Sequence, residues 1–168
     1  GVMRAAFEKA ISYSKERVVF SHPIGDYQLT RVKLARMAAH LAACRQITYG
    51  VARLVDEGKG DMEASGAKLF TCKTAEWFTR EALQIHGGYG YIKDYQVERY
   101  YRDARINRIF EGTNEINRLL IPTLFFRRAD SGALDLWEQV NSVQSVICSE
   151  NCEDAGGDSL FGPEFSLL

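Results

Sequence analysis

The scarcity of proline is the feature that most restricts how this chain can fold. Only three prolines occur in 168 residues, at Pro23, Pro122 and Pro163. Proline lacks a backbone N–H and crowds the carbonyl group four residues earlier, so it interrupts helices. The stretches without proline, above all the one between Pro23 and Pro122, therefore leave the chain free to form long helices.

Small and apolar side chains recur at helical spacing along the first half of the chain. In residues 2–17 they lie three and four positions apart, which predicts one buried helix face. A turn follows at 21–25, and Asp26 is a suitable N-cap for a second helix. That helix carries a seam typical of a bundle before Gly58–Gly60 end it, at Leu34, Met37, Leu41, Cys44, Thr48, Val51 and Val55.

A third long helix is expected from Asp61, as its cap, to His86, where a glycine-rich turn stops it. A shorter helix is expected near 96–105, and a fourth bundle helix begins near Thr113, which Pro122 should kink or end. Residues 135–148 predict one more short helix, and no stretch predicts a strand. The fold class is therefore all-α, an up-down four-helix bundle.

Charge and composition exclude several classes of protein. The chain has 22 acidic and 21 basic residues, without the basic excess of a nucleic-acid-binding protein. No stretch approaches the roughly 18 apolar residues of a membrane-spanning helix.

Cys148 and Cys152 have no further ligand nearby, so no metal site is expected. A tail rich in Gly, Ser, Asp and Glu from about residue 148 predicts poor order.

Three blocks of residues together identify a family. The segment Gln84–Asp94, with its Gly87-Gly88-x-Gly90 core, resembles the C-terminal signature of the acyl-CoA dehydrogenase family. The segment Ile109–Ile116 (IFEGTNEI) resembles that family's catalytic loop. Upstream, Glu16-Arg17-x-x-Phe20 followed by Gln28 resembles its flavin-contacting turn. The resemblance covers about residues 1–128, and three blocks at family-like spacing are far more specific than one glycine motif.

The resemblance implies α,β-dehydrogenation of a fatty acyl-CoA thioester, with Glu111 removing the proton from Cα and FAD accepting the hydride. A site that excludes water makes a carboxylate a stronger base, which the weakly acidic α-proton requires. Gly112 would let the thioester approach closely, as a substrate-binding position. Without the motif, Glu111 would be an ordinary carboxylate favoured near a helix start.

The resemblance also assigns cofactor-binding residues. Arg17 would pair with the FAD pyrophosphate, and the glycine turn would lie against the FAD of a neighbouring subunit, making the enzyme a homodimer or homotetramer. Each position has a structural alternative as well: a cap, a core aromatic, or an exposed helix residue. The full expected set is Arg17, Phe20, Gln28, Gln84, Gly87, Gly88, Thr113 and Glu115.

Some positions depart from the family's pattern. Val19 stands where a polar residue often contacts FAD, Ser21 where glycine is common, and His22 where a cation is common. These departures put details of the pyrophosphate contacts in doubt and leave the family assignment intact.

The family pattern also predicts the setting of the chain. Residues 1–130 would be the C-terminal helical domain, and 131–168 the partly disordered start of an extension found in very-long-chain-type members. The N-terminal and middle domains would precede it in a longer enzyme, so the chain alone would be inactive. An electron-transferring flavoprotein would be the redox partner, in a mitochondrial matrix or bacterial cytoplasm. An acyl-CoA oxidase and a non-catalytic helical assembly domain remain alternatives.

Overall fold

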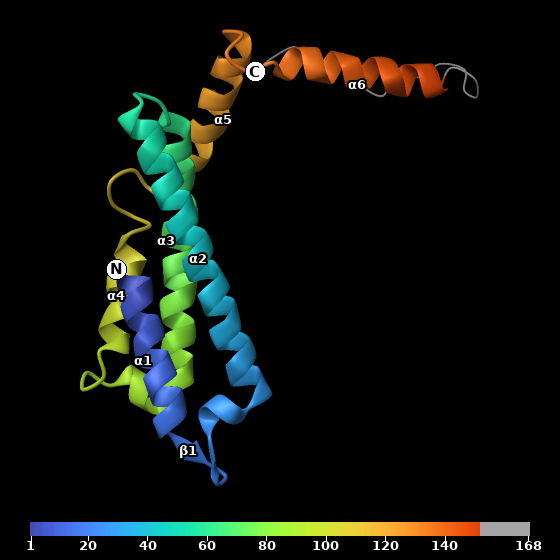
Figure 1. Ribbon diagram of the computed structural model, residues 1–168. Helices are drawn as coiled ribbons and strands as arrows, with labels where there is room; N and C mark the ends of the chain where they lie inside the picture. Colours follow the sequence, from blue (N-terminus) through green and yellow to red (C-terminus); the bar gives the residue numbers. More distant parts are fainter. Residues whose placement is uncertain (152–168) are drawn as a thin grey trace. The chain divides into compact units, whose positions relative to one another are not determined.

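The computed structural model describes residues 1–151, with side chains through residue 148, and confirms an all-α fold (Figure 1). The first of its two compact units ends at Leu124 and the second begins at Phe125. The first unit contains the long helices α1 (Val2–Glu16), α2 (Gln28–Asp56) and α3 (Asp61–His86), followed by the shorter α4 (Val97–Ile106). The predicted extents of the first and third helices agree closely with these bounds.

Helix α3 is the centre of the first unit, because α1, α2 and α4 all pack against it. Phe78 of α3 is fully buried, and its ring meets that of Phe7 edge-on, with the ring centres 6.0 Å apart. Small residues on α1 allow this close approach. The buried core comprises Ala6, Ala10, Met37, Phe78, Ala82 and Ile85. The apolar helix faces predicted from the sequence therefore pack against α3.

The connection between α1 and α2 differs from the prediction. Two antiparallel strands that the sequence did not predict, β1 (Val18–Val19) and β2 (His22–Pro23), form a small hairpin. A short 3₁₀ helix, η1 (Ile24–Asp26), follows it, and α2 begins only at Gln28 with Tyr27 as its N-cap. The predicted N-cap role of Asp26 is therefore wrong.

The ends of α3 are set by glycines. Gly60 occupies the N-cap position predicted for Asp61, while an Asp61 carboxylate oxygen accepts a hydrogen bond from the Met62 amide at 2.8 Å. At the other end, the predicted glycine-rich turn forms a 3₁₀ helix, η2 (Gly87–Tyr91). The sequence predicted that the helix after Gly112 would be the fourth helix of the bundle. In the structure, α4 is the helix that packs against α1 and α3 instead.

The last described helices are α5 (Asn114–Asp130) and α6 (Leu136–Asn151). Of the two effects predicted for Pro122, a kink or the end of the helix, the second is wrong, because Pro122 lies inside α5. Helix α6 confirms the short helix predicted near 135–148. The tail for which poor order is predicted lies almost wholly outside the described residues, as does Cys152. Within residues 1–151, no helix is both long and apolar enough to cross a membrane.

Candidate active site

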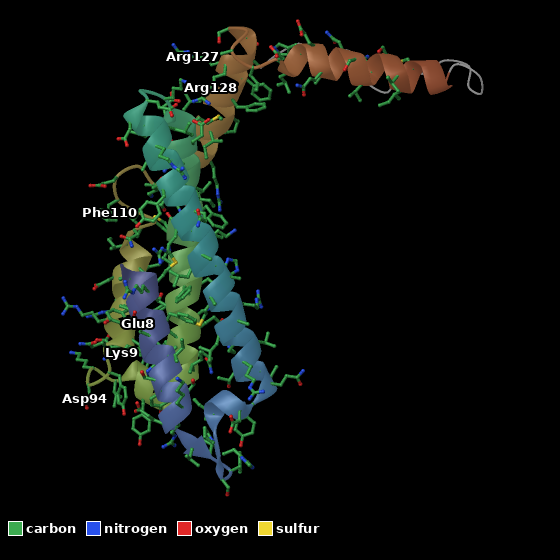
Figure 2. All side chains as sticks on the ribbon, viewed as in Figure 1. Glu8, Lys9, Asp94, Phe110, Arg127 and Arg128 are labelled. Carbon is green, nitrogen blue, oxygen red and sulfur yellow. The ribbon has the colours of Figure 1, made fainter. Side chains whose placement is uncertain are left out.

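The loop between α4 and α5 carries the predicted base, Glu111. Glu111 has a φ of 51° and Gly112 a φ of 81°, so two successive residues adopt the left-handed conformation. This backbone conformation is uncommon for residues with a side chain. It persists where the neighbouring structure enforces it, often at functional sites. The Glu111 side chain is exposed, beside the half-exposed Phe110 that Figure 2 labels on the same loop.

Hydrogen bonds from two helices hold the end of this loop. The Lys68 ammonium of α3 donates to the Gly112 carbonyl oxygen at 2.8 Å and to Asn114 Oδ1 at 2.9 Å. Asn117 Nδ2 of α5 donates to the same Gly112 oxygen at 3.0 Å. The Asn114 amide donates back to the Arg108 carbonyl oxygen at 3.0 Å, which closes the loop on itself. The conformation around Glu111 is therefore fixed from both sides.

An ion pair holds the start of the same loop. Arg108 donates a hydrogen bond to the Glu76 carboxylate on α3, and Arg105 Nε lies 3.6 Å from the other Glu76 oxygen. The hydrogen bond to Glu76 raises the pKa of Arg108. Two buried nitrogens near the loop, Arg108 Nε and Asn114 Nδ2, have no hydrogen-bond partner among the described residues. The loop thus borders polar groups that remain able to donate.

Thr113 acts locally as the predicted N-cap of α5. Its Oγ1 accepts a hydrogen bond from the Ile116 amide at 3.1 Å, as an N-cap side chain does. Glu115 lies exposed in the first turn of α5. Both residues therefore stand at the helix end nearest Glu111.

A second group of predicted residues surrounds a cavity of about 470 Å³ near the C-terminal end of α3. Arg17, at the C-cap of α1, places its guanidinium 5.5 Å from the centre of the Tyr89 ring. The lining residues are Tyr13, Arg17, Val19, Ile24, Ile85, His86, Gly87, Gly88, Tyr89 and Ile92. The fold thus brings Arg17 together with Gly87 and Gly88, although some 70 residues separate them in the sequence.

The remaining predicted positions lie outside this cavity lining. Phe20 is 87% exposed at the tip of the hairpin, where it adopts a φ of 51°. Gln28 is exposed at the first residue of α2, and Gln84 is exposed in the last turn of α3. The described chain therefore presents these three side chains on its surface.

His86 packs in the cavity wall. Its ring stacks on Tyr13 with centres 4.3 Å apart, and Nδ1 donates to the Ala82 carbonyl oxygen at 2.8 Å. Burial lowers the pKa of His86, which favours the neutral ring. Across residues 1–151, no group of three or more His, Cys, Asp or Glu residues is arranged to hold a metal ion.

Comparison with known proteins decides the family. The sequence model described as "Acyl-CoA dehydrogenase, C-terminal domain" matches residues 1–123. The chain belongs to the acyl-CoA dehydrogenase family. Within this family, a "Probable acyl-CoA dehydrogenase" of Bacillus subtilis is 35% identical over 180 residues, covering 95% of this chain and 30% of that protein.

Two further relatives illustrate the range of proteins that this chain resembles. The caffeyl-CoA reductase-Etf complex subunit CarC of Acetobacterium woodii is 40% identical over 129 residues, covering 76% of this chain and 34% of that protein. The structure of an acyl-CoA dehydrogenase complexed with FAD from Bacillus anthracis matches 95% of this chain and 30% of that one, with 36% identity and a TM-score of 0.80. The chain spans about a third of the length of these relatives.

Several residues of the site escaped the sequence analysis. Lys68, Glu76 and Arg108 are charged residues on or next to helices, where solvent exposure is the usual expectation. The contact between Lys68 and Gly112 joins positions 44 residues apart. No local pattern in a single sequence carries such a contact, so only the folded structure reveals it.

Proposed function

We propose that this chain supplies the base-bearing, C-terminal helical part of a flavin-dependent enzyme that dehydrogenates acyl-CoA thioesters between Cα and Cβ. One observation carries the proposal. In this chain, a member of the family, Glu111 has a left-handed backbone conformation in a loop held by hydrogen bonds, and a glycine follows it. A carboxylate with no catalytic role would have little need of that backbone conformation.

Glu111 acts as the general base in this proposal. Its carboxylate accepts the proton from Cα, and the backbone amide of Glu111 is a candidate donor to the thioester oxygen on which charge develops. Gly112 offers room for the thioester, because a side-chain carbon added there would meet only the Asn117 amide group, at 3.7 Å or more. A flat group can therefore approach the backbone beside the base.

The cavity near the end of α3 fits part of FAD. A diphosphate needs a cation, and the Arg17 guanidinium stands in the cavity wall with a geometry suited to paired phosphate contacts. A side-chain carbon added at Gly87 or Gly88 would meet no atom within 4 Å, so their backbone is open to approach. When bound, FAD supplies the hydride acceptor.

The other proposed contacts to FAD are the exposed Phe20, Gln28 and Gln84, together with Thr113 and Glu115 at the start of α5. Some of these residues would serve the FAD of a neighbouring subunit, so the proposal includes a homodimer or homotetramer. Exposed side chains near a cofactor cavity are suited to such a shared site, since a second copy would cover them. The very-long-chain subtype for residues 131–168 is part of the same proposal.

Acyl-CoA is the proposed substrate and an electron-transferring flavoprotein the proposed redox partner. The name of the Acetobacterium relative supports this partner, since that protein is a subunit of a reductase-Etf complex. We place the protein in a bacterial cytoplasm or a mitochondrial matrix, since its relatives include bacterial proteins and a mitochondrial one of Bos taurus.

The test uses the complete polypeptide that contains this chain, purified with FAD. Glu111→Gln should retain the yellow, FAD-bound protein and slow the bleaching of FAD by acyl-CoA by at least about 10²-fold, the lower range for loss of a general base. Glu57→Gln, at an exposed carboxylate after α2, is the matched control and should bleach normally. Unchanged bleaching in Glu111→Gln would contradict the base role. Peroxide formation in air without an acceptor would indicate an oxidase, and purification without FAD an assembly domain.

A further inference from the structure

Helix α3 holds the loop that carries Glu111 at both ends. At the start of the loop, the Glu76 carboxylate of α3 binds the Arg108 guanidinium. At its end, Lys68 of α3 binds the Gly112 carbonyl and the Asn114 side chain. Glu76 and Lys68 lie eight positions apart, which is about two helical turns, so both project toward one side of α3. One rigid helix therefore fixes the two ends of this loop.

Lys68 contacts the part of the loop that determines how Glu111 is presented. A carbonyl oxygen has two lone pairs, and on Gly112 both are occupied, one by Lys68 at 2.8 Å and one by Asn117 at 3.0 Å. With both bonds made, the Gly112 peptide plane has little freedom to rotate. The peptide plane before it carries the Glu111 backbone, so the direction of the Glu111 side chain is set at the same time.

The conformation of this loop needs such support. Glu111 and Gly112 both have positive φ, and a glutamate in this region returns to ordinary backbone angles unless its neighbours prevent it. Lys68 is suited to hold Glu111 and Gly112 in this conformation, because a charged donor makes a stronger hydrogen bond than a neutral one. The acceptor Asn114 is itself fully buried, which fixes the position of the second contact.

We propose that Lys68 is a positioning residue for the Glu111 carboxylate, acting through the Gly112 carbonyl and Asn114. This inference rests on the proposed role of Glu111 as base. Lys68 does not take part in the chemistry: it restricts Glu111 to the orientation from which the carboxylate reaches Cα. A displacement of about 1 Å in a reacting group is enough to slow a step by as much as 100-fold.

The experiment isolates proton removal from oxidation. An acyl-CoA with sulfur in place of the β-methylene cannot give up a hydride from that position, but its α-proton can still be removed. In D₂O the Cα–H bond breaks, its electron pair stays on the thioester as the enolate, and the proton moves to Glu111. The carboxyl group exchanges this proton with solvent and returns a deuteron to Cα. Mass spectrometry of the analogue then measures the exchange rate, and no electron acceptor is needed.

Four forms of the complete FAD-containing protein are compared. Lys68→Met removes the donors and keeps the length of the side chain, whereas Lys68→Arg keeps a charged donor. Lys73→Met, at an exposed lysine on the same helix, is the matched control, and Glu111→Gln tests the base. Binding of the analogue and FAD content are measured on each form. Hydrogen exchange of the amides of residues 108–114 reports the loop itself, independently of activity.

Lys68→Met should slow α-proton exchange by about 10-fold to 100-fold, with FAD content and analogue binding close to those of the control. Amide exchange in residues 108–114 should rise, and Lys68→Arg should restore much of both properties. Normal exchange in Lys68→Met, with exchange abolished in Glu111→Gln, overturns the role of Lys68 and leaves the base intact. Equal loss of FAD in both Lys68 variants also overturns it, since this indicates a general structural role. Normal α-proton exchange in Glu111→Gln overturns the proposed function itself.

Discussion

Replacing Gly90 by alanine should destabilise the fold far more than the same change at Gly88 in the same turn. A side-chain carbon at Gly90 would lie 2.5 Å from the Leu83 carbonyl oxygen and 3.0 Å from His86 Cβ. The first contact involves backbone at the end of α3, which cannot rotate away as a flexible side chain can. At Gly88, the added carbon would meet no atom within 4 Å.

The size of the effect follows from the overlap. Ordinary contact begins at 3.4 Å, so the turn and the end of α3 must separate by about 0.9 Å, a strain that belongs to the upper part of the 1–3 kcal/mol range for overpacking. A loss of about 2–3 kcal/mol lowers the melting temperature of a chain of this size by roughly 4–12 °C.

Urea unfolding of this chain, followed by circular dichroism, measures the difference in free energy of unfolding between the two variants. Gly88→Ala should match the wild-type midpoint, whereas the Gly90→Ala midpoint should fall with an unchanged slope. Coincident midpoints for the two variants would refute the reasoning about the turn. In the complete protein, Gly88→Ala should still weaken FAD retention, because the new methyl group occupies the backbone surface proposed to face the cofactor.

Two other predictions concern residues beside the two parts of the site. Thr113→Ala should cost about 1 kcal/mol by removing the cap of α5, and should speed amide exchange at Ile116, whereas Thr113→Ser should restore protection. Burial lowers the pKa of His86 in the fold, so below about pH 6.5 the unfolded chain binds a proton that the folded chain does not. Stability should therefore fall as pH decreases from 6.5 through the folded-state pKa. His86→Phe should flatten that part of a stability–pH curve measured by urea unfolding, and an unchanged slope would exclude His86 as its source.

The long helices were predictable because each repeats its pattern over many turns. Met37 and Cys44, for example, belong to the seam predicted for the second helix, and both are buried. The start of α2 was not predictable, because its N-cap is Tyr27, which makes no capping hydrogen bond with its side chain and is not a favoured N-cap residue. The Tyr27 hydroxyl donates to the Val19 carbonyl oxygen at 2.7 Å, across the hairpin, and this contact is invisible in the sequence.

Pro122 shows the limit of a local rule. Its effect on a helix is one lost hydrogen bond and a local clash, and the remaining turns of the 17-residue α5 continue on both sides of it. The candidate site also has one part that the sequence indicates and one part that only the structure shows. The order of residues around Glu111 and Gly87 carries a family resemblance, whereas the support from Lys68 and Glu76 depends on tertiary contacts that no short motif encodes.

Helix α3 serves the loop of Glu111 near one end and the cavity of Arg17 at the other. From Lys68 to His86 it advances about 27 Å, at 1.5 Å and 100° per residue. Insertion or deletion of one residue in this interval would turn one end by about 100° relative to the other, and no side-chain adjustment could realign both. The length and phase of α3 are thus constrained together, and variation in length among related sequences should be confined to connections such as residues 57–60.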